Sequence, residues 1–318
     1  MSITRLAPSP TGALHLGNAR TFLINWLLAR QNGWKIILRI EDLDGPRIKR
    51  GADQQAIDDL RWLGIDWDDG PIHQSSRLDR YRLALDKLLA SKRAYYCTCT
   101  RKEVDSAASA PHAEDGAAIY PGTCRDRFTT YEHAMRHSRG RQPAVRFDTR
   151  GQHDVDFTDC FSGAHHFDVE RQLGDFVIAK GDGTPAYQLA VVIDDADMNV
   201  TQIVRGDDLL DSTPRQLLLY RALGLGEHIP TYTHLPLVIG PDGRRLAKRH
   251  GDTRLASYRD AGVSAGRLIS LLASWCGIES TDNASTAADL IGKFELNRVP
   301  RSPIVFDPAV TRLESAGR

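Results

Sequence analysis

No segment limits the possible folds of this chain more than the loop Ala7-Pro8-Ser9-Pro10-Thr11-Gly12. Two prolines and a glycine exclude a helix or a central strand at this point. The loop follows a short apolar run at 3–6 and precedes apolar side chains that recur at helical spacing up to Gly33. Because Lys35–Ile40 (KIILRI) then resembles a buried strand, the order strand, loop, helix, strand predicts a parallel βαβ unit.

The remaining pattern predicts an α/β fold built on a parallel sheet. Predicted helices are 53–63, 81–89 and a helix opened by Thr213-Pro214 and closed by Gly224. Predicted strands are 175–179, 189–193 and 201–204, and the chain from about 257 is expected to be mainly helical. The residue composition changes between 95 and 167. The cysteines cluster there, and an Ala/Ser/Gly stretch at 106–118 is expected to be a loop. We interpret this region as an insertion.

Composition narrows the class of protein. The 318 residues suggest two domains at about 150 residues each. Lys+Arg and Asp+Glu are both 41, so the zero net charge argues against a global attraction to nucleic acid or membrane, while leaving room for a local basic surface such as Arg47, Lys49 and Arg50. No apolar run is long enough to span a bilayer and the first residues lack a signal core, so we expect a cytoplasmic protein. Five cysteines, an odd count, argue against a disulfide framework.

The segment from Pro8 to Asn18 is a candidate phosphate site. It opens the first helix, where free N–H groups and the positive dipole end favour anions. Gly12 and Gly17 let a ligand approach the backbone, and His15 can donate a hydrogen bond to a polyphosphate oxygen. The alternative is that His15 only caps or packs the helix.

A second candidate is the basic cluster Arg244, Arg245, Lys248 and Arg249, which follows Gly240-Pro241-Asp242-Gly243. A loop of cations can close over a triphosphate and stabilise the leaving pyrophosphate. The alternative is a solvated basic turn.

Five ordered blocks resemble those of class I aminoacyl-tRNA synthetases over about residues 5–249. PSPTGALHLGN resembles the HIGH motif and RLAKR the KMSKS loop, and RIEDLD at 39–44 resembles a segment of the glutamyl branch. AYQLA at 186–190 and VRGDDLL at 204–210 resemble two further blocks of that branch. The sequence departs from the pattern at Asn18, Gly45, Arg245 and Ala247, and arginine does not reproduce the geometry of lysine.

The resemblance implies a Rossmann-type parallel-sheet catalytic domain with a zinc-bearing α+β insertion and a short C-terminal helical region. The expected division is 1–90 and 171–243 for the two catalytic halves, 91–170 for the insertion, and 244–318 for the KMSKS-like loop and a stem-contact-like tail. The resemblance also implies that ATP is bound by seven residues, namely Pro8, Thr11, Gly12, His15, Gly17, Asn18 and Lys248. His15, Asn18, Arg245 and Lys248 are the expected catalytic residues.

The amino-acid pocket can also be argued from charge. A glutamate substrate has two carboxylates and one ammonium, which two arginines and one acid would complement. Arg5, Arg205 and Glu41 end predicted parallel strands, where ligand contacts gather. The resemblance extends this set to Arg5, Ala7, Ser9, Glu41, Tyr187 and Arg205. We expect Arg205 to read the side-chain carboxylate and Glu41 the α-ammonium; the alternative for Glu41 is a surface ion pair with Arg39.

Cys97, Cys99 and Cys124 form a candidate zinc site, since thiolates suit a closed structural zinc with four ligands. Ligand chemistry suggests His112 as the fourth ligand, whereas the resemblance to one subgroup implies Tyr120. The alternative is three buried free thiols. Cys160 and Cys276 are expected to be buried apolar residues.

About 70 residues follow the basic loop, which is too few for a complete anticodon-binding domain. The resemblance is therefore to a truncated subgroup, and it implies an ATP- and Mg²⁺-dependent ligase that activates L-glutamate as glutamyl-adenylate. The glutamyl group then passes to the wobble base queuosine of tRNA(Asp), and a monomer is expected. The alternatives are a truncated glutamyl-tRNA synthetase that charges the 3′ end of tRNA(Glu), a small-metabolite adenylyltransferase, and a non-catalytic tRNA-binding paralogue.

Overall fold

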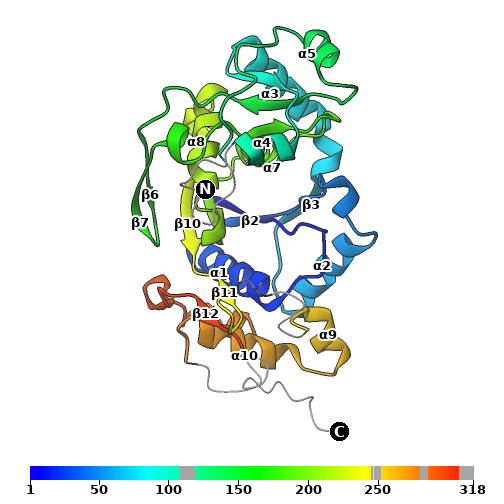
Figure 1. Ribbon diagram of the computed structural model, residues 1–318. Coiled ribbons are helices and arrows are strands. Elements are labelled where there is room, and N and C mark those ends of the chain that lie inside the picture. Colours follow the sequence, from blue (N-terminus) through cyan, green and yellow to red (C-terminus); the bar gives the residue numbers. More distant parts are fainter. Residues whose placement is uncertain (108–118, 245, 247–251, 280–285, 308–318) are drawn as a thin grey trace.

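The computed structural model describes residues 1–107, 119–244, 246, 252–279 and 286–307 (Figure 1). It begins with β1 (Ile3–Leu6), α1 (Leu16–Asn32) and β2 (Lys35–Ile40), and β1 pairs with β2 in parallel. α1 ends because Gly33 adopts the left-handed conformation, with φ of 63°. β3 (Asp69–His73) pairs in parallel with the far edge of β2. The predicted βαβ unit is confirmed.

A four-stranded sheet has the order β7-β6-β10-β9. Its strands are β6 (Val155–Asp159), β7 (Gly163–Phe167), β9 (Gln202–Gly206) and β10 (Thr231–Leu235). β9, β10 and β6 are parallel, whereas β7 returns antiparallel to β6. The Thr201 backbone N–H donates to the Ile3 carbonyl at 2.9 Å, and the Ile3 N–H donates to the Thr201 hydroxyl at 3.0 Å. These bonds bring β9 beside β1, so the carboxyl ends of strands from both sheets face one region.

A third sheet has the order β4-β5-β8, from β4 (Ala94–Cys97), β5 (Ala144–Phe147) and β8 (Val177–Ala179). The helices that accompany the sheets are α2 (Ala52–Trp62), α3 (Leu78–Ala90), α4 (Arg101–Ala107), α5 (Tyr131–His137), α6 (Val169–Gln172), α7 (Tyr187–Asp197) and α8 (Ser212–Ala222). The predicted helices near 53–63, 81–89 and 213–223 are confirmed as α2, α3 and α8. Residues 106 and 107 of the predicted loop end α4, and 108–118 lie outside the described residues.

The C-terminal segment contains α9 (Leu255–Asp260) and α10 (Ala265–Trp275), as predicted, but it is not helical throughout. β12 (Ile304–Val305) pairs in parallel with β11 (Val238–Ile239). Apolar side chains of α10 join those of α1 and α2 in one core. A second core joins α3, α7 and α8 to strands of the other two sheets.

The strand predicted at 189–193 is wrong, because these residues lie within α7. The run Leu189–Ala196 is buried on every side of the helix, so it lacks the polar face that marks an amphipathic helix. The strand predicted at 175–179 is shorter than expected, since β8 begins at Val177. No helix in the described part of the chain is long and apolar enough to cross a membrane.

Candidate functional site: a cavity at the strand ends

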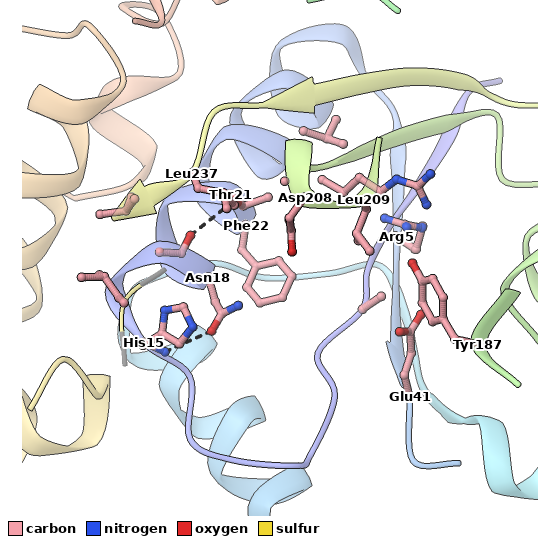
Figure 2. A pocket seen from close by; sticks show the side chains of 17 residues that line it. Arg5, His15, Asn18, Thr21, Phe22, Glu41, Tyr187, Asp208, Leu209 and Leu237 are labelled. Carbon is pink, nitrogen blue, oxygen red and sulfur yellow. Dashed lines mark hydrogen bonds between the residues drawn. The ribbon is translucent and has the colours of Figure 1, made fainter. Parts of the chain in front are cut away.

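A cavity of about 260 Å³ lies where the strands of the first two sheets end (Figure 2). β1 contributes Arg5, and Ala7 follows it; β2 is followed by Glu41. α7 contributes Tyr187 at its first turn, and β9 contributes Arg205. The start of α1 adds His15, Gly17 and Asn18. The carboxyl ends of parallel strands are where ligands bind in open α/β sheets. Five of the six residues predicted to hold an amino acid line this cavity, and Ser9 does not.

The N-terminus of α1 forms one wall of this cavity. His15 is the N-cap residue, and its backbone N–H donates to Asn18 Oδ1 at 3.3 Å, which closes a capping box. A Cβ on Gly17 would lie 3.2 Å from the His15 ring, so a larger residue would push that ring aside. The capping interpretation of His15 is therefore confirmed, and the residue also lines the cavity, whereas its hydrogen bond to a polyphosphate stays a prediction.

An adjoining cavity of about 810 Å³ shares His15 and Leu246 with the first. Thr11 and Gly12 line it together with Lys49, Arg50 and Arg254. Pro8 is buried, and its carbonyl accepts a hydrogen bond from the Glu41 backbone at 3.0 Å. The predicted residues Arg245 and Lys248 lie outside the described residues.

Arg205 is 4% exposed and is held by three neutral acceptors. Its Nε donates to His234 Nε2 at 3.0 Å, Nη1 donates to Gln216 Oε1 at 3.0 Å, and Nη2 donates to Thr213 Oγ1 at 2.8 Å. Sequence reasoning did not identify these partners, which come from α8 and β10 and meet Arg205 only in the fold.

Arg5 and Arg39 share the carboxylate of Asp195, a residue that sequence reasoning missed. Arg39 Nη1 donates to Asp195 Oδ1 at 2.5 Å, and Arg5 Nε lies 3.5 Å from the same oxygen. Arg39 Nη2 donates to Glu41 Oε1 at 3.1 Å. The alternative of an ion pair between Glu41 and Arg39 is thus partly confirmed: the pair forms, but not at the surface, because Arg39 is fully buried and Glu41 is only 13% exposed. Burial raises the pKa of Glu41, although Arg39 and Arg5 oppose the rise.

The neighbouring Asp194 anchors a second buried group. It accepts hydrogen bonds from Arg77 Nε at 2.6 Å, Gln74 Nε2 at 2.7 Å and Tyr81 Oη at 2.8 Å. The available signal was a pair of aspartates in the apolar run of α7 and an arginine in the apolar run of β2. Charges inside apolar runs indicate that they are paired with each other.

Tyr187 and Ser9, which are also predicted to line the glutamate pocket, lie in different surroundings. Tyr187 lies beside Glu41 in the cavity (Figure 2), and burial raises the pKa of its hydroxyl. Ser9 is exposed, and its hydroxyl donates to the Glu41 carbonyl at 3.2 Å. Ser9 thus fixes the backbone next to the buried acid.

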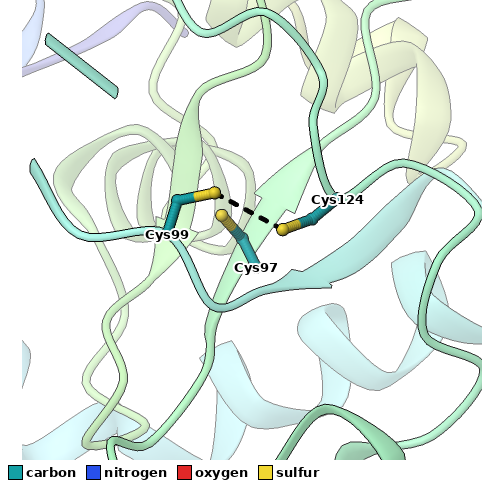
Figure 3. Close-up of side chains that lie close together, drawn as sticks. All are labelled: Cys97, Cys99 and Cys124. Atoms are coloured by element: carbon teal, nitrogen blue, oxygen red, sulfur yellow. Dashed lines mark hydrogen bonds between the residues drawn. The ribbon is translucent and has the colours of Figure 1, made fainter. Parts of the chain in front are cut away.

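Cys97, Cys99 and Cys124 converge within the insertion region, with their Sγ atoms all within 4.8 Å of one another (Figure 3). The Tyr120 hydroxyl lies 3.4 Å from Cys97 Sγ and 3.5 Å from Cys99 Sγ. Hydrogen bonding with Cys97 lowers the pKa of the Cys124 thiol, whereas hydrogen bonding with Cys124 raises the pKa of the Cys97 thiol. Three thiols that lie this close together fit the thiolate donors of a structural zinc site, and the Tyr120 hydroxyl is the nearby group that the resemblance names as the fourth ligand.

The other predictions on cysteine and histidine have mixed outcomes. Cys276 is buried as expected, but Cys160 is exposed, because it follows the end of β6 at the turn to β7. His112 lies outside the described residues.

Comparisons with known proteins identify the family to which this chain is similar. The sequence profile described as "tRNA synthetases class I (E and Q), catalytic domain" matches residues 2–312. A protein of Symbiobacterium thermophilum named glutamyl-Q tRNA(Asp) synthetase is 49% identical over 310 residues, which cover 94% of each chain. A glutamate–tRNA ligase of Geobacter sulfurreducens is 41% identical, and the match covers 96% of this chain and 63% of the ligase. The crystal structure of a glutamate tRNA ligase from Elizabethkingia meningosepticum in complex with its amino acid is 29% identical with a TM-score of 0.79, covering 96% of this chain and 67% of that one.

Proposed function

The chain belongs to the family of class I tRNA synthetases for glutamate and glutamine and is a ligase of that type, and we propose that it activates L-glutamate with ATP and transfers it to the queuosine base of tRNA(Asp). The observation that carries the proposal is a cavity in which two buried arginines and a carboxylate that is only 13% exposed meet a helix N-terminus. This arrangement complements an amino acid with two carboxylates next to a polyphosphate.

The charges of the cavity assign the parts of the substrate. Arg205 binds the side-chain carboxylate, because an arginine pairs with a carboxylate through two parallel hydrogen bonds. Arg5 adds positive charge on the same side, and Tyr187 donates a hydrogen bond. Glu41 binds the α-ammonium, while Ala7 and Ser9 shape the backbone that carries the cavity wall.

ATP binds along the start of α1 and the adjoining cavity, against Thr11, Gly12, Gly17 and the two polar residues His15 and Asn18. Pro8, which lines neither cavity, shapes the loop that leads to them. The α-carboxylate oxygen attacks the α-phosphorus, the bond to the β-phosphate oxygen breaks, and pyrophosphate leaves. His15 and Asn18, together with Arg245 and Lys248, stabilise the charge that develops on the phosphates. Mg²⁺, when bound with ATP, supplies further neutralisation of phosphate charge.

Cys97, Cys99, Cys124 and Tyr120 would hold one structural zinc ion. The zinc would join β4 to the segment at 120–124 and so stiffen the insertion. We assign 91–170 to this insertion, 1–90 and 171–243 to the catalytic halves, and 244–318 to the loop and tail.

The identities to the named relatives support queuosine as the acceptor. Three relatives named glutamyl-Q tRNA(Asp) synthetase are 43–49% identical to this chain. Four relatives named glutamate–tRNA ligase are 39–41% identical. The chain is thus more similar in sequence to the relatives named glutamyl-Q tRNA(Asp) synthetase.

Acylation with labelled glutamate tests the proposal on three RNAs: tRNA(Asp) with queuosine, tRNA(Asp) without it, and tRNA(Glu) without it. We expect label only in the first. Label in queuosine-free tRNA(Glu) would instead support charging of the 3′ end, which the similarity to glutamate–tRNA ligases favours as the second candidate. A chain with neither acylation nor glutamate-dependent ATP–pyrophosphate exchange would be a non-catalytic tRNA-binding protein.

A further inference from the structure

A buried pair, Asp159 and His234, lies behind Arg205 and has no part in the proposed chemistry. We propose that this pair positions Arg205 through a single imidazole tautomer and leaves the charge of the arginine available to the ligand. The Asp159–His234 pair thereby sets the preference for glutamate over glutamine. The inference rests on the proposed glutamate pocket and adds the residues that determine its selectivity.

The hydrogen bonds fix the tautomer of His234. A guanidinium carries only donors, so His234 Nε2, which lies 3.0 Å from Arg205 Nε, must be an acceptor without a proton. The proton of the neutral ring is therefore on Nδ1, which lies 2.7 Å from Asp159 Oδ2. Both side chains are fully buried. The chain of donors runs in one direction, from Arg205 to His234 and from His234 to Asp159.

Asp159 is itself fixed by the turn between β6 and β7. Its Oδ1 accepts from the backbone N–H groups of Phe161 at 2.9 Å and Ser162 at 2.8 Å, and its Oδ2 accepts from the His234 backbone at 3.0 Å. Burial alone would raise its pKa, but the hydrogen bonds from His234 and from the turn lower it to about 2. Asp159 therefore stays ionised at neutral pH and holds the Nδ1–H tautomer.

The acceptors around Arg205 leave its charge without a carboxylate partner among the described residues. His234, Thr213 and Gln216 are all neutral, whereas Arg39 pairs directly with Asp195 and Glu41. Three of the five N–H groups of a guanidinium are used in this way. One N–H on each terminal nitrogen remains, which matches the two oxygens of a carboxylate. The neutral amide of glutamine would lose half of this pairing and the attraction of charge.

The orientation of Gln216 is determined by the same kind of chain. Its Nε2 donates to Gln188 Oε1 at 3.0 Å, and Gln188 Nε2 donates to Ser212 Oγ at 2.9 Å. Gln216 therefore presents its oxygen, and not its amino group, to Arg205. The guanidinium is held on two sides by acceptors whose direction the fold has set.

Asp159→Asn tests the inference with little change in shape. The amide introduced by this substitution would place a donor opposite Nδ1, which drives His234 to the Nε2–H tautomer and sets two donors, Nε2–H and Arg205 Nε–H, against each other. In ATP–pyrophosphate exchange we expect KM for glutamate to rise about tenfold, because the loss of one charge-assisted hydrogen bond weakens binding by about that factor. KM for ATP should be unchanged. The preference for glutamate over glutamine should fall by a similar factor.

His234→Leu removes the acceptor entirely, and His234→Gln restores one without a fixed direction. We expect the glutamate KM of His234→Gln to lie between those of the wild type and His234→Leu. The matched control is His166→Gln. His166 forms an exposed pair with Asp156, at 2.8 Å, on the β6–β7 hairpin that also carries Asp159. Its kinetic constants should equal those of the wild type.

Nitrogen NMR of histidine-labelled wild-type protein gives a readout that does not depend on whether a variant folds. We expect the His234 ring as the Nδ1–H tautomer at pH 7, and as Nε2–H in Asp159→Asn. An Nε2–H tautomer or an imidazolium in the wild type would overturn the inference, as would an unchanged glutamate KM in folded Asp159→Asn. Absence of glutamate-dependent exchange in the wild type would instead overturn the proposed function, and the inference with it.

Discussion

At the scale of single residues, the site depends on how buried charges are compensated. Asp195 is the carboxylate nearest to both Arg5 and Arg39 and is inaccessible to solvent. Arg5 and Arg39 carry two positive charges, and the carboxylates of Asp195 and Glu41, when ionised, formally balance them. Asp195 therefore sets how much positive charge faces the ligand and also holds β1, β2 and α7 together.

Asp195→Asn should destabilise the fold because it leaves a buried arginine without its strongest partner. We expect the free energy of unfolding in urea to fall by about 3–5 kcal/mol. Asp197→Asn is the control on the same helix, since Asp197 is partly exposed and pairs with Arg77 at 2.8 Å. It should cost less than about 1 kcal/mol. Equal losses in the two variants would contradict the assigned role of Asp195.

Arg5, Glu41 and Arg205 could be predicted from the sequence, because a strand followed by a loop predicts where a side chain meets a ligand. Asp195, Thr213 and His234 could not, although each contacts one of the predicted arginines. They lie on elements whose packing against β1 and β9 is a property of the tertiary fold. Local pattern identifies the residues at the strand ends better than the residues behind them.

At the scale of elements, the cysteine cluster joins β4 to the segment at 120–124. Cys99→Ser should abolish the zinc content, whereas Cys160→Ser, at an exposed thiol outside the cluster, should retain about one zinc per chain by elemental analysis. In the wild type we expect the exposed Cys160 to react rapidly with a thiol reagent, and the three cluster thiols only after chelation. Equal reactivity with and without chelator would exclude the site.

The elements also show where local sequence is sufficient. Gly33 ends α1 through its own backbone conformation, so the βαβ unit follows from short-range signals. α7 does not, because the run Leu189–Ile193 is equally consistent with a buried strand. Its helical form is set by burial between α3 and α8 and by the buried partners of Asp194.

At the scale of the whole molecule, the segment after the basic loop, which contains α9 and α10, packs against α1 and α2 through hydrogen bonds and an ion pair. Arg20 of α1 donates to the carbonyl of Trp275 in this segment at 3.1 Å, and also to that of Pro236, which precedes the basic loop, at 2.5 Å. Asp59 of α2 pairs with Arg259 of α9 at 3.1 Å. These contacts join residues near the two ends of the described chain, so unfolding of the tail and of the catalytic unit should be coupled.

The Asp59 contact makes this coupling sensitive to pH. Burial raises the pKa of Asp59 to about 6, against the opposing effect of Arg259, so the folded protein holds a proton that the unfolded chain releases near pH 4. The stability from this group is therefore complete below about pH 4 and is lost as the pH rises through 6. Relative to Asp59→Asn, which cannot ionise, the wild type should lose unfolding free energy between about pH 4.5 and 6.5, measured by urea unfolding at about four pH values. Asp79→Asn, at a position 93% exposed, should run parallel to the wild type. If the free energy of unfolding depends on pH in the same way for the wild type and Asp59→Asn, Arg259 keeps this carboxylate ionised throughout. The contact between the tail and the catalytic unit would then be an ion pair at every pH tested.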